Sequence, residues 1–209
     1  MMRNQTSRIR AVAGATLVVA ALVLVGRAGA TAARGLQLAA PGRAAITAIA
    51  GPGVRVRCAI PPAHVGLVET LGHVVWDRRL IELRPVICKN LNALGSLPAS
   101  PYSKASFAQA QAFLVLVHES VHLSEYDGAR DEALTECRAI QLIRETALTI
   151  GVDETTARAL GHEALRFDAR LPGPGHWMVG LHEIPNYHAP DCYDGGALDI
   201  HPESHDWPN

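Results

Sequence analysis

Residues 107–122, FAQAQAFLVLVHESVH, decide the fold of this chain. Apolar side chains that share one helix face recur at alternating steps of three and four residues. The run places them at Phe107, Ala110, Leu114, Val117 and Val121. Ser103 is a suitable N-cap residue ahead of the run, and Gly128 is the first glycine after it. The pattern predicts a long amphipathic helix that ends at Gly128.

The end of this stretch is an H-E-x-x-H, formed by His118, Glu119 and His122. Residues four apart stand one turn apart on the same helix face, so both imidazoles can converge on one cation. Neutral imidazole is a good ligand for Zn²⁺. Glu119 lies next to that face, close enough to take a proton from a metal-bound water. We therefore expect His118 and His122 to bind Zn²⁺ and Glu119 to be the catalytic base.

A third ligand is expected from the next helix, predicted from about residue 130 to residue 150, where Gly151 stops it. The apolar stripe of this helix, extended backwards from Ile140, reaches Glu136 and Glu132. Both carboxylates therefore point to the buried face, where a carboxylate needs a partner such as a metal ion or an imidazole. Other side chains remain alternatives for the third ligand: Asp127, Asp131, His162, His176, His182 and His188.

The H-E-x-x-H and the downstream Glu-Ala-x-x-Glu at residues 132–136 resemble the gluzincin metallopeptidases, the thermolysin-like branch of the zincins. In that family the Glu of the second helix is the third zinc ligand, and an acid four residues later hydrogen-bonds a ligating His. The resemblance implies that Glu132 is the third ligand and that Glu136 orients a ligating His. The metzincin pattern is rejected, because Glu125 and Gly128 stand where it requires Gly and His.

The resemblance covers only residues 107–150, and the chain departs from the family inside that range. The segment between His122 and Glu132 is much shorter than in thermolysin, and Glu136 replaces an Asp. A minimal zincin without an inserted substructure is therefore implied, and the choice between Glu132 and Glu136 as ligand stays open. The same motifs, with Cys137 directly after Glu136, are also similar to exported actinobacterial proteins of unknown activity.

The amino-terminal residues 1–30 have the order of a secretory signal peptide. Arg3, Arg8 and Arg10 precede an uncharged run at residues 11–26, and small residues follow at 28–30. An uncleaved N-terminal membrane anchor is the alternative. Both interpretations place the rest of the chain outside the cytoplasm, either secreted or anchored to the cell membrane.

The cysteines fit that compartment. An even number of cysteines in an exported protein favours disulfides, here two among Cys58, Cys88, Cys137 and Cys192. We favour pairing Cys58 with Cys88, because the two bracket one compact segment, and Cys137 with Cys192.

The remaining segments predict an α+β fold that is mainly helical. Residues 31–53, rich in Ala, Gly and Arg, resemble a linker with little to pack. Residues 54–209 are expected to form one zincin-like metallopeptidase domain with an irregular, Pro-rich tail. The expected elements before and after the two central helices are strands at 74–76 and 80–83, a helix at 85–94 and a helix capped by Asp153 that ends near 170. The strands would form a small hairpin or sheet packed on the H-E-x-x-H helix, with Trp76 in the core.

Composition narrows the function. A chain of 209 residues suffices for one domain, and a net charge of −1 argues against nucleic acid as a partner. The sequence therefore predicts a zinc-dependent peptidase that hydrolyses a peptide or protein substrate outside the cytoplasm. The alternative is a non-catalytic exported binding protein with a structural zinc site. The donor that would steady an oxyanion is left open among Tyr126, His162, His176, His182 and Tyr187.

Overall fold

The computed structural model describes residues 36–59, 71–94, 107–126, 128–169, 177–179, 182–184, 187–205 and 207, with the backbone alone at 177–179 and 182–184. The chain divides into two units, residues 1–35 and 36–209, and every described residue belongs to the second. The expected signal peptide or anchor at residues 1–30 thus lies outside the described residues. In the part that the structure describes, no helix is long and apolar enough to cross a membrane.

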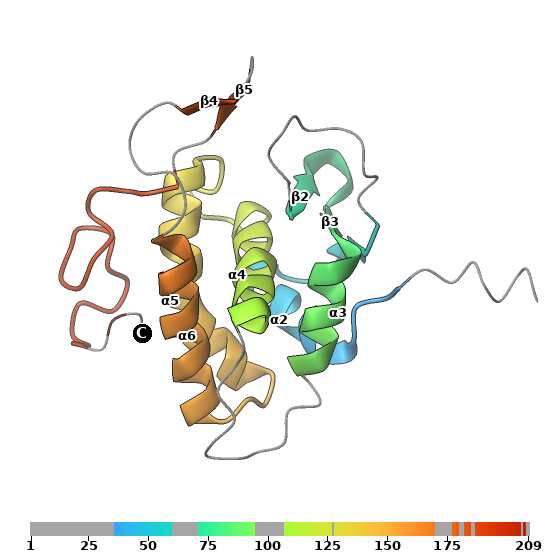
Figure 1. The fold of residues 1–209 in the computed structure, drawn as a ribbon, viewed down its shortest axis with the longest axis horizontal. Coiled ribbons are helices and arrows are strands. Elements are labelled where there is room, and N and C mark those ends of the chain that lie inside the picture. The colour runs from blue at the N-terminus through green and yellow to red at the C-terminus, as the bar shows by residue number, and fades with distance from the viewer. Residues whose placement is uncertain are drawn as a thin grey trace, which may run out of the picture. The chain divides into compact units, whose positions relative to one another are not determined.

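The described elements confirm a mainly helical α+β fold (Figure 1). The helices are α2 (Ala40–Ala50), α3 (Pro85–Leu94), α4 (Phe107–His122), α5 (Glu132–Thr149) and α6 (Glu154–Asp168). The strands are β1 (Arg55–Arg57), β2 (Gly72–Val75), β3 (Leu80–Leu83), β4 (Trp177–Val179) and β5 (His182–Ile184), and a 3₁₀ turn, η1 (Trp76–Arg78), joins β2 to β3. The predicted helix at 85–94 and both predicted strands are present.

Helix α4 is the centre of the fold, in contact with all four other helices and with β2 and β3. Because it has neighbours on several sides, it is buried nearly all round from Ala110 onward rather than along one stripe. It ends at His122, so the predicted end at Gly128 is wrong. The chain tightens there through bonds from Leu123 N and Ser124 N to carbonyls three residues back, and the Ser124 hydroxyl donates to Val121 O at 2.7 Å.

Helix α6 begins at its predicted cap, whereas α5, expected from about residue 130, begins at Glu132 behind a cap that was not predicted. The Asp131 carboxylate accepts a hydrogen bond from Leu134 N at 2.9 Å, and the Asp153 carboxylate accepts one from Thr156 N at 3.0 Å. Helix α5 stops before Gly151, whose φ of 88° suits a residue without a side chain. Since α5 packs on α4, the first turn of α5 is held beside the last turn of α4.

The small sheet has the order β1-β3-β2, which makes β2 an edge strand. Strands β2 and β3 form the predicted antiparallel hairpin, with Gly72 opposite Leu83 and Val74 opposite Ile81. This face of the sheet packs on α4, where Ile81 and Leu83 are fully buried. Strand β1 pairs in parallel with β3 and was not expected.

The expected linker at residues 31–53 is wrong for its second half. Residues 40–50 form α2, which packs against α4 and α5 and buries Ala45, Ile46 and Ala50. An alanine-rich segment has high helix propensity, and its small side chains let two helices approach closely. Composition alone therefore led to the prediction of a linker where the chain forms a packed helix.

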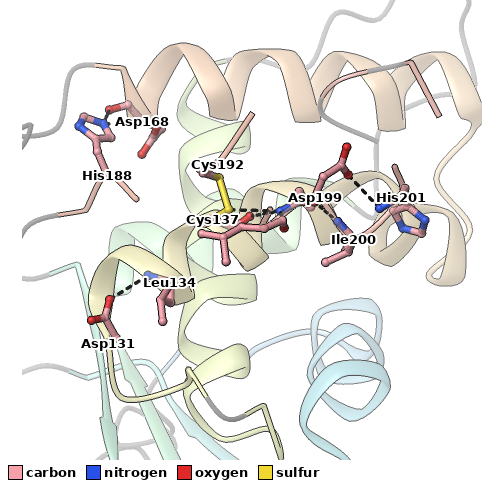
Figure 2. Close-up of a disulfide and its surroundings, with 11 residues drawn as sticks. Asp131, Leu134, Cys137, Asp168, His188, Cys192, Asp199, Ile200 and His201 are labelled. Atoms are coloured by element: carbon pink, nitrogen blue, oxygen red, sulfur yellow. Dashed lines mark hydrogen bonds and ion pairs between the residues drawn. A yellow bond between two sulfur atoms is a disulfide. The ribbon is translucent and has the colours of Figure 1, made fainter. Parts of the chain in front are cut away.

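Two disulfides join Cys58 to Cys88 and Cys137 to Cys192, as predicted. The first ties the end of the β1 segment to α3. The second ties α5 to the carboxyl-terminal tail, whose residues from 187 onward are irregular as expected (Figure 2). The Gln141 side chain on α5 holds the same tail through Leu198 O and Ile200 N. The antiparallel hairpin of β4 and β5 within the tail was not predicted.

Candidate metal centre

Three side chains from α4 and α5 converge on one point. His118 and His122 lie one turn apart on α4, and Glu132 is the first residue of α5. Their Nε2, Nε2 and Oε2 atoms form a triangle, with 3.0 Å between the two nitrogens and 3.0 and 3.4 Å from these to the carboxylate oxygen. All three donor atoms lie within 4.8 Å of one another, so the group could hold a metal ion. It contains both predicted imidazoles and the favoured third ligand.

The size of the triangle fits a tetrahedral Zn²⁺ site. Zinc–nitrogen and zinc–oxygen bonds are about 2.0–2.2 Å long, so two donors of a tetrahedron stand about 3.3 Å apart. All three separations are close to this edge length. The donor set, two imidazoles and one carboxylate, is also one that catalytic zinc sites use.

The atoms behind the imidazoles fix which ring nitrogen carries hydrogen. His118 Nδ1 lies 2.6 Å from Glu136 Oε2, and His122 Nδ1 lies 2.5 Å from the carbonyl oxygen of Ala129. A carbonyl only accepts and a carboxylate strongly prefers to accept, so both Nδ1 atoms donate. Neutral rings of this tautomer direct two Nε2 lone pairs, together with the Glu132 carboxylate, at one point. Such a grouping is stable only around a cation.

The pKa values of His118 and Glu132 in the metal-free protein also indicate that a positive charge between these donors is favourable. Burial alone lowers the pKa of His118, but hydrogen bonds to Glu132 and Glu136 outweigh it and raise that pKa to about 10. Burial alone raises the pKa of Glu132, but hydrogen bonds to His118 and His122 lower it to about 2. Without a metal, an added proton on His118 therefore supplies the cation between these donors.

Glu119 lies beside the cluster and is not a member of it. It is buried at 6% exposure, and burial raises its pKa to about 7 against the opposing charges of His118 and His122. Edge strand β2 passes directly next to it. A side chain at Gly72 would place its first carbon 2.8 Å from Glu119 Oε1 and 2.9 Å from Glu119 Cγ, so any larger residue would force Glu119 to shift.

Two aromatic side chains flank the cluster, each beside a different histidine. The Tyr187 ring lies 6.0 Å from the His118 ring, and burial together with nearby carboxylates raises the pKa of its phenol. The Trp76 ring makes an edge contact with His122 at 5.8 Å. Trp76 is 40% exposed, so the expectation that it belongs to the core is wrong. It directly follows strand β2 and lies beside one imidazole of the cluster.

The remaining candidates lie elsewhere or outside the described side chains. Asp131 caps α5 with its carboxylate, and His162 is exposed on α6. Tyr126 faces Arg138, with 5.7 Å between ring and guanidinium. The Nε2 atom of His188 contacts the carbonyl oxygen of Asp168 at 3.0 Å (Figure 2). Asp127, His176 and the side chain of His182 lie outside the part of the chain that the structure describes.

The centre has partners that the sequence analysis missed. The Ala129 carbonyl is a backbone atom, and Gly72 has no side chain, so neither is visible as a chemical motif. Comparison of the chain with protein-family models, curated proteins and solved structures yields no match. The function is therefore inferred from the geometry of the centre.

Proposed function

We propose that this protein is a zinc-dependent metallopeptidase that hydrolyses peptide bonds outside the cytoplasm. One observation carries the proposal: three inward-facing donors at tetrahedral spacing, with a buried carboxylate, Glu119, beside them. The two disulfides suggest an oxidising, extracytoplasmic environment and support the location.

His118, His122 and Glu132 would hold the metal, and Glu136 would keep the His118 ring in place. When bound, Zn²⁺ supplies Lewis-acid polarisation of the scissile carbonyl and lowers the pKa of the attacking water. Glu119 takes a proton from that water and passes it to the leaving amine. Its buried position excludes competing hydrogen bonds from bulk solvent.

Two further elements fit a peptidase. Among the described strands, β2 has no neighbour on its outer edge, which begins at Gly72 next to Glu119, and an extended peptide can pair with such an edge through its backbone. The Tyr187 ring lies 6.0 Å from the His118 ring, which makes its phenol a candidate for the oxyanion donor. A phenol that remains protonated can donate a hydrogen bond to the oxyanion of the tetrahedral intermediate.

The test compares zinc content and hydrolysis of a broad peptide library in three proteins. Wild type should carry about one zinc per chain and cleave peptides. Glu119→Gln should keep the zinc and lose cleavage, since Glu119 is not a ligand. Tyr187→Phe should keep the zinc and lose about 10²- to 10³-fold in kcat, the range for loss of one oxyanion donor.

Glu125→Gln is the matched control for Glu119→Gln. Glu125 is exposed just beyond the end of α4, and its substitution should change neither zinc content nor cleavage. A zinc-loaded but inert wild type would reject the peptidase and favour the non-catalytic binding protein. Cleavage that survives in Glu119→Gln would reject the role of this base.

A further inference from the structure

A cationic side chain lies over the aromatic ring that contacts one imidazole of the candidate metal centre. The guanidinium carbon of Arg130 lies 4.7 Å from the centre of the Trp76 ring. The same ring contacts His122, so only one indole separates the guanidinium from a ligating imidazole. Arg130 is exposed and Trp76 is 40% exposed, so solvent and solutes reach both.

The carboxylates closest to Arg130 in the sequence and at the Trp76 turn are engaged elsewhere. Asp131 caps α5, and Glu132 lies between the two imidazoles. Asp77 is within 3.8 Å of Arg78. Among the described residues, no carboxylate forms an ion pair with Arg130.

Stacking leaves the useful edge of the guanidinium available. A guanidinium held face-on by an aromatic ring keeps its N–H groups in its own plane, where they can bind a carboxylate with two parallel hydrogen bonds. The ring also restricts the otherwise flexible side chain, so less entropy is lost when a carboxylate binds. The pair is therefore arranged as a receptor for a carboxylate.

The position of the pair relates it to a bound peptide. Strand β2 runs from Gly72, which touches Glu119, to Val75, and Trp76 follows at once. At about 3.3 Å per residue, Trp76 stands roughly 13 Å along this edge from Gly72. A peptide paired with β2 would thus pass Glu119 and, within about four residues, reach the Trp76–Arg130 pair.

We propose that Trp76 and Arg130 form a subsite that selects peptides with a carboxylate close to the scissile bond. The carboxylate is an acidic side chain or the carboxyl terminus of the peptide. Selection during hydrolysis depends on the proposed peptidase activity, whereas recognition of the carboxylate does not. Trp76 shapes and orients the subsite, and Arg130 supplies its charge.

The experiment measures peptide binding without turnover. The full-length, zinc-loaded Glu119→Gln protein is titrated with fluorescent peptides that form matched pairs. One series exchanges Glu for Gln at each position of a common sequence, and the other exchanges a free carboxyl terminus for an amide. A charge-assisted hydrogen bond predicts about 10- to 100-fold tighter binding of the acidic member in the series that supplies the carboxylate.

Variants of the subsite are made in the same protein. Arg130→Gln should abolish the preference, and Arg130→Lys should keep only part of it because a lysine cannot bind a carboxylate in the same two-pronged way. Arg138→Gln is the matched control, since Arg138 on α5 also lies over an aromatic ring, that of Tyr126. It should leave the preference unchanged.

Two results would overturn the subsite: equal binding of both members in every pair, or a preference that survives in Arg130→Gln. Absence of binding by every peptide would overturn it as well. The proposed peptidase activity is judged separately, by cleavage in wild type. Acidic preference with an inert wild type would keep the subsite and reject the peptidase, whereas cleavage without preference would do the reverse.

Discussion

At the scale of single residues, the centre depends on the atoms that hold each imidazole from behind. Glu136 binds His118 Nδ1 and the Ala129 carbonyl binds His122 Nδ1, so both Nε2 lone pairs face inward. These contacts differ in kind from the one that Glu132 makes, since its carboxylate lies on the inward side. The two glutamates of α5, one turn apart, should therefore respond differently to the same substitution.

Glu132→Gln is expected to weaken zinc binding far more than Glu136→Gln does. The first substitution removes one of the three proposed protein ligands. The second leaves an amide oxygen that can still accept from His118 Nδ1, and loss of such an outer partner typically lowers metal affinity by about 10- to 100-fold. Competition with a chromophoric chelator measures both affinities. The reverse order would exchange the roles of the two glutamates, and unchanged affinity in both would move the third ligand elsewhere.

Asp168, at the end of α6, is expected to make the stability of the fold depend on pH. It is 9% exposed, and its pKa is raised to about 6, first by burial and then by the Glu136 charge, against the opposing effect of His188. Unfolding returns the group to its ordinary value near 3.9. The folded state thus binds the proton more firmly between about pH 4 and pH 6, and stability from this group falls as pH rises through that window.

Asp168→Asn should therefore stabilise the metal-free protein above pH 6, by about 1 kcal/mol after allowance for the water that reaches the carboxylate. Below pH 4 the gain should vanish, because the wild-type group is then protonated in both states. Urea denaturation across this pH range measures it. Glu163→Gln, on the same helix but paired with Arg166, is the control and should show no such gain.

At the scale of elements, the helices that carry the cluster could be predicted, because they depend on the local periodicity of apolar residues. The residues of the cluster and Glu136 all fall within 118–136, on two helices whose buried faces follow from the spacing of their apolar residues. The predicted end of α4 at Gly128 was wrong, because the turn after His122 depends on hydrogen bonds of Ser124. Strand β1 was missed because Arg55–Arg57 is too short to show a pattern and pairs with a distant strand.

The contributions of the edge strand and the tail could not be predicted for a related reason. Gly72 reaches Glu119 only because the sheet packs on α4, and Tyr187 reaches His118 only because the tail returns to α5. Both are long-range consequences of packing. A sequence motif reports the chemistry on one element, and it does not report which distant element will lie over it.

The tail gives a prediction about the second disulfide. Replacing Cys137 and Cys192 with Ser opens a loop of 55 residues, which should destabilise the protein by about 4 kcal/mol. It also removes the covalent link between α5 and the tail that carries Tyr187. We expect the zinc affinity to change little and the rate of peptide cleavage to fall.

The matched control is the Cys58 and Cys88 double Ser variant. Its loop of 30 residues should give a similar loss of stability, measured by urea denaturation, with cleavage per folded molecule unchanged. Equal losses of cleavage in the two double variants would contradict a role for the tail at the centre.

At the scale of the whole molecule, a metal bound by α4 and α5 should stabilise the fold, because the unfolded chain does not present the three donors together. Zinc at 100 times its dissociation constant should add about 2.7 kcal/mol. For a chain of this size that is a rise of about 5–10 °C in Tm, measured by thermal scanning with and without zinc. The double variant His118→Ala, His122→Ala should show no rise. Mg²⁺ should have little effect on wild type, since it prefers octahedral oxygen ligands.

The disulfide connectivity has a consequence for how the chain is oxidised. The first cysteine joins the second, and the third joins the fourth. If the chain enters an oxidising compartment with its amino end leading, Cys58 and Cys88 are both present before Cys137 arrives. Pairing in order of arrival then gives the native bonds directly. An interleaved pattern would instead require early bonds to be attacked and exchanged by later thiolates. A simple thiol oxidase, without a disulfide isomerase, is therefore sufficient for this protein to acquire its native cross-links.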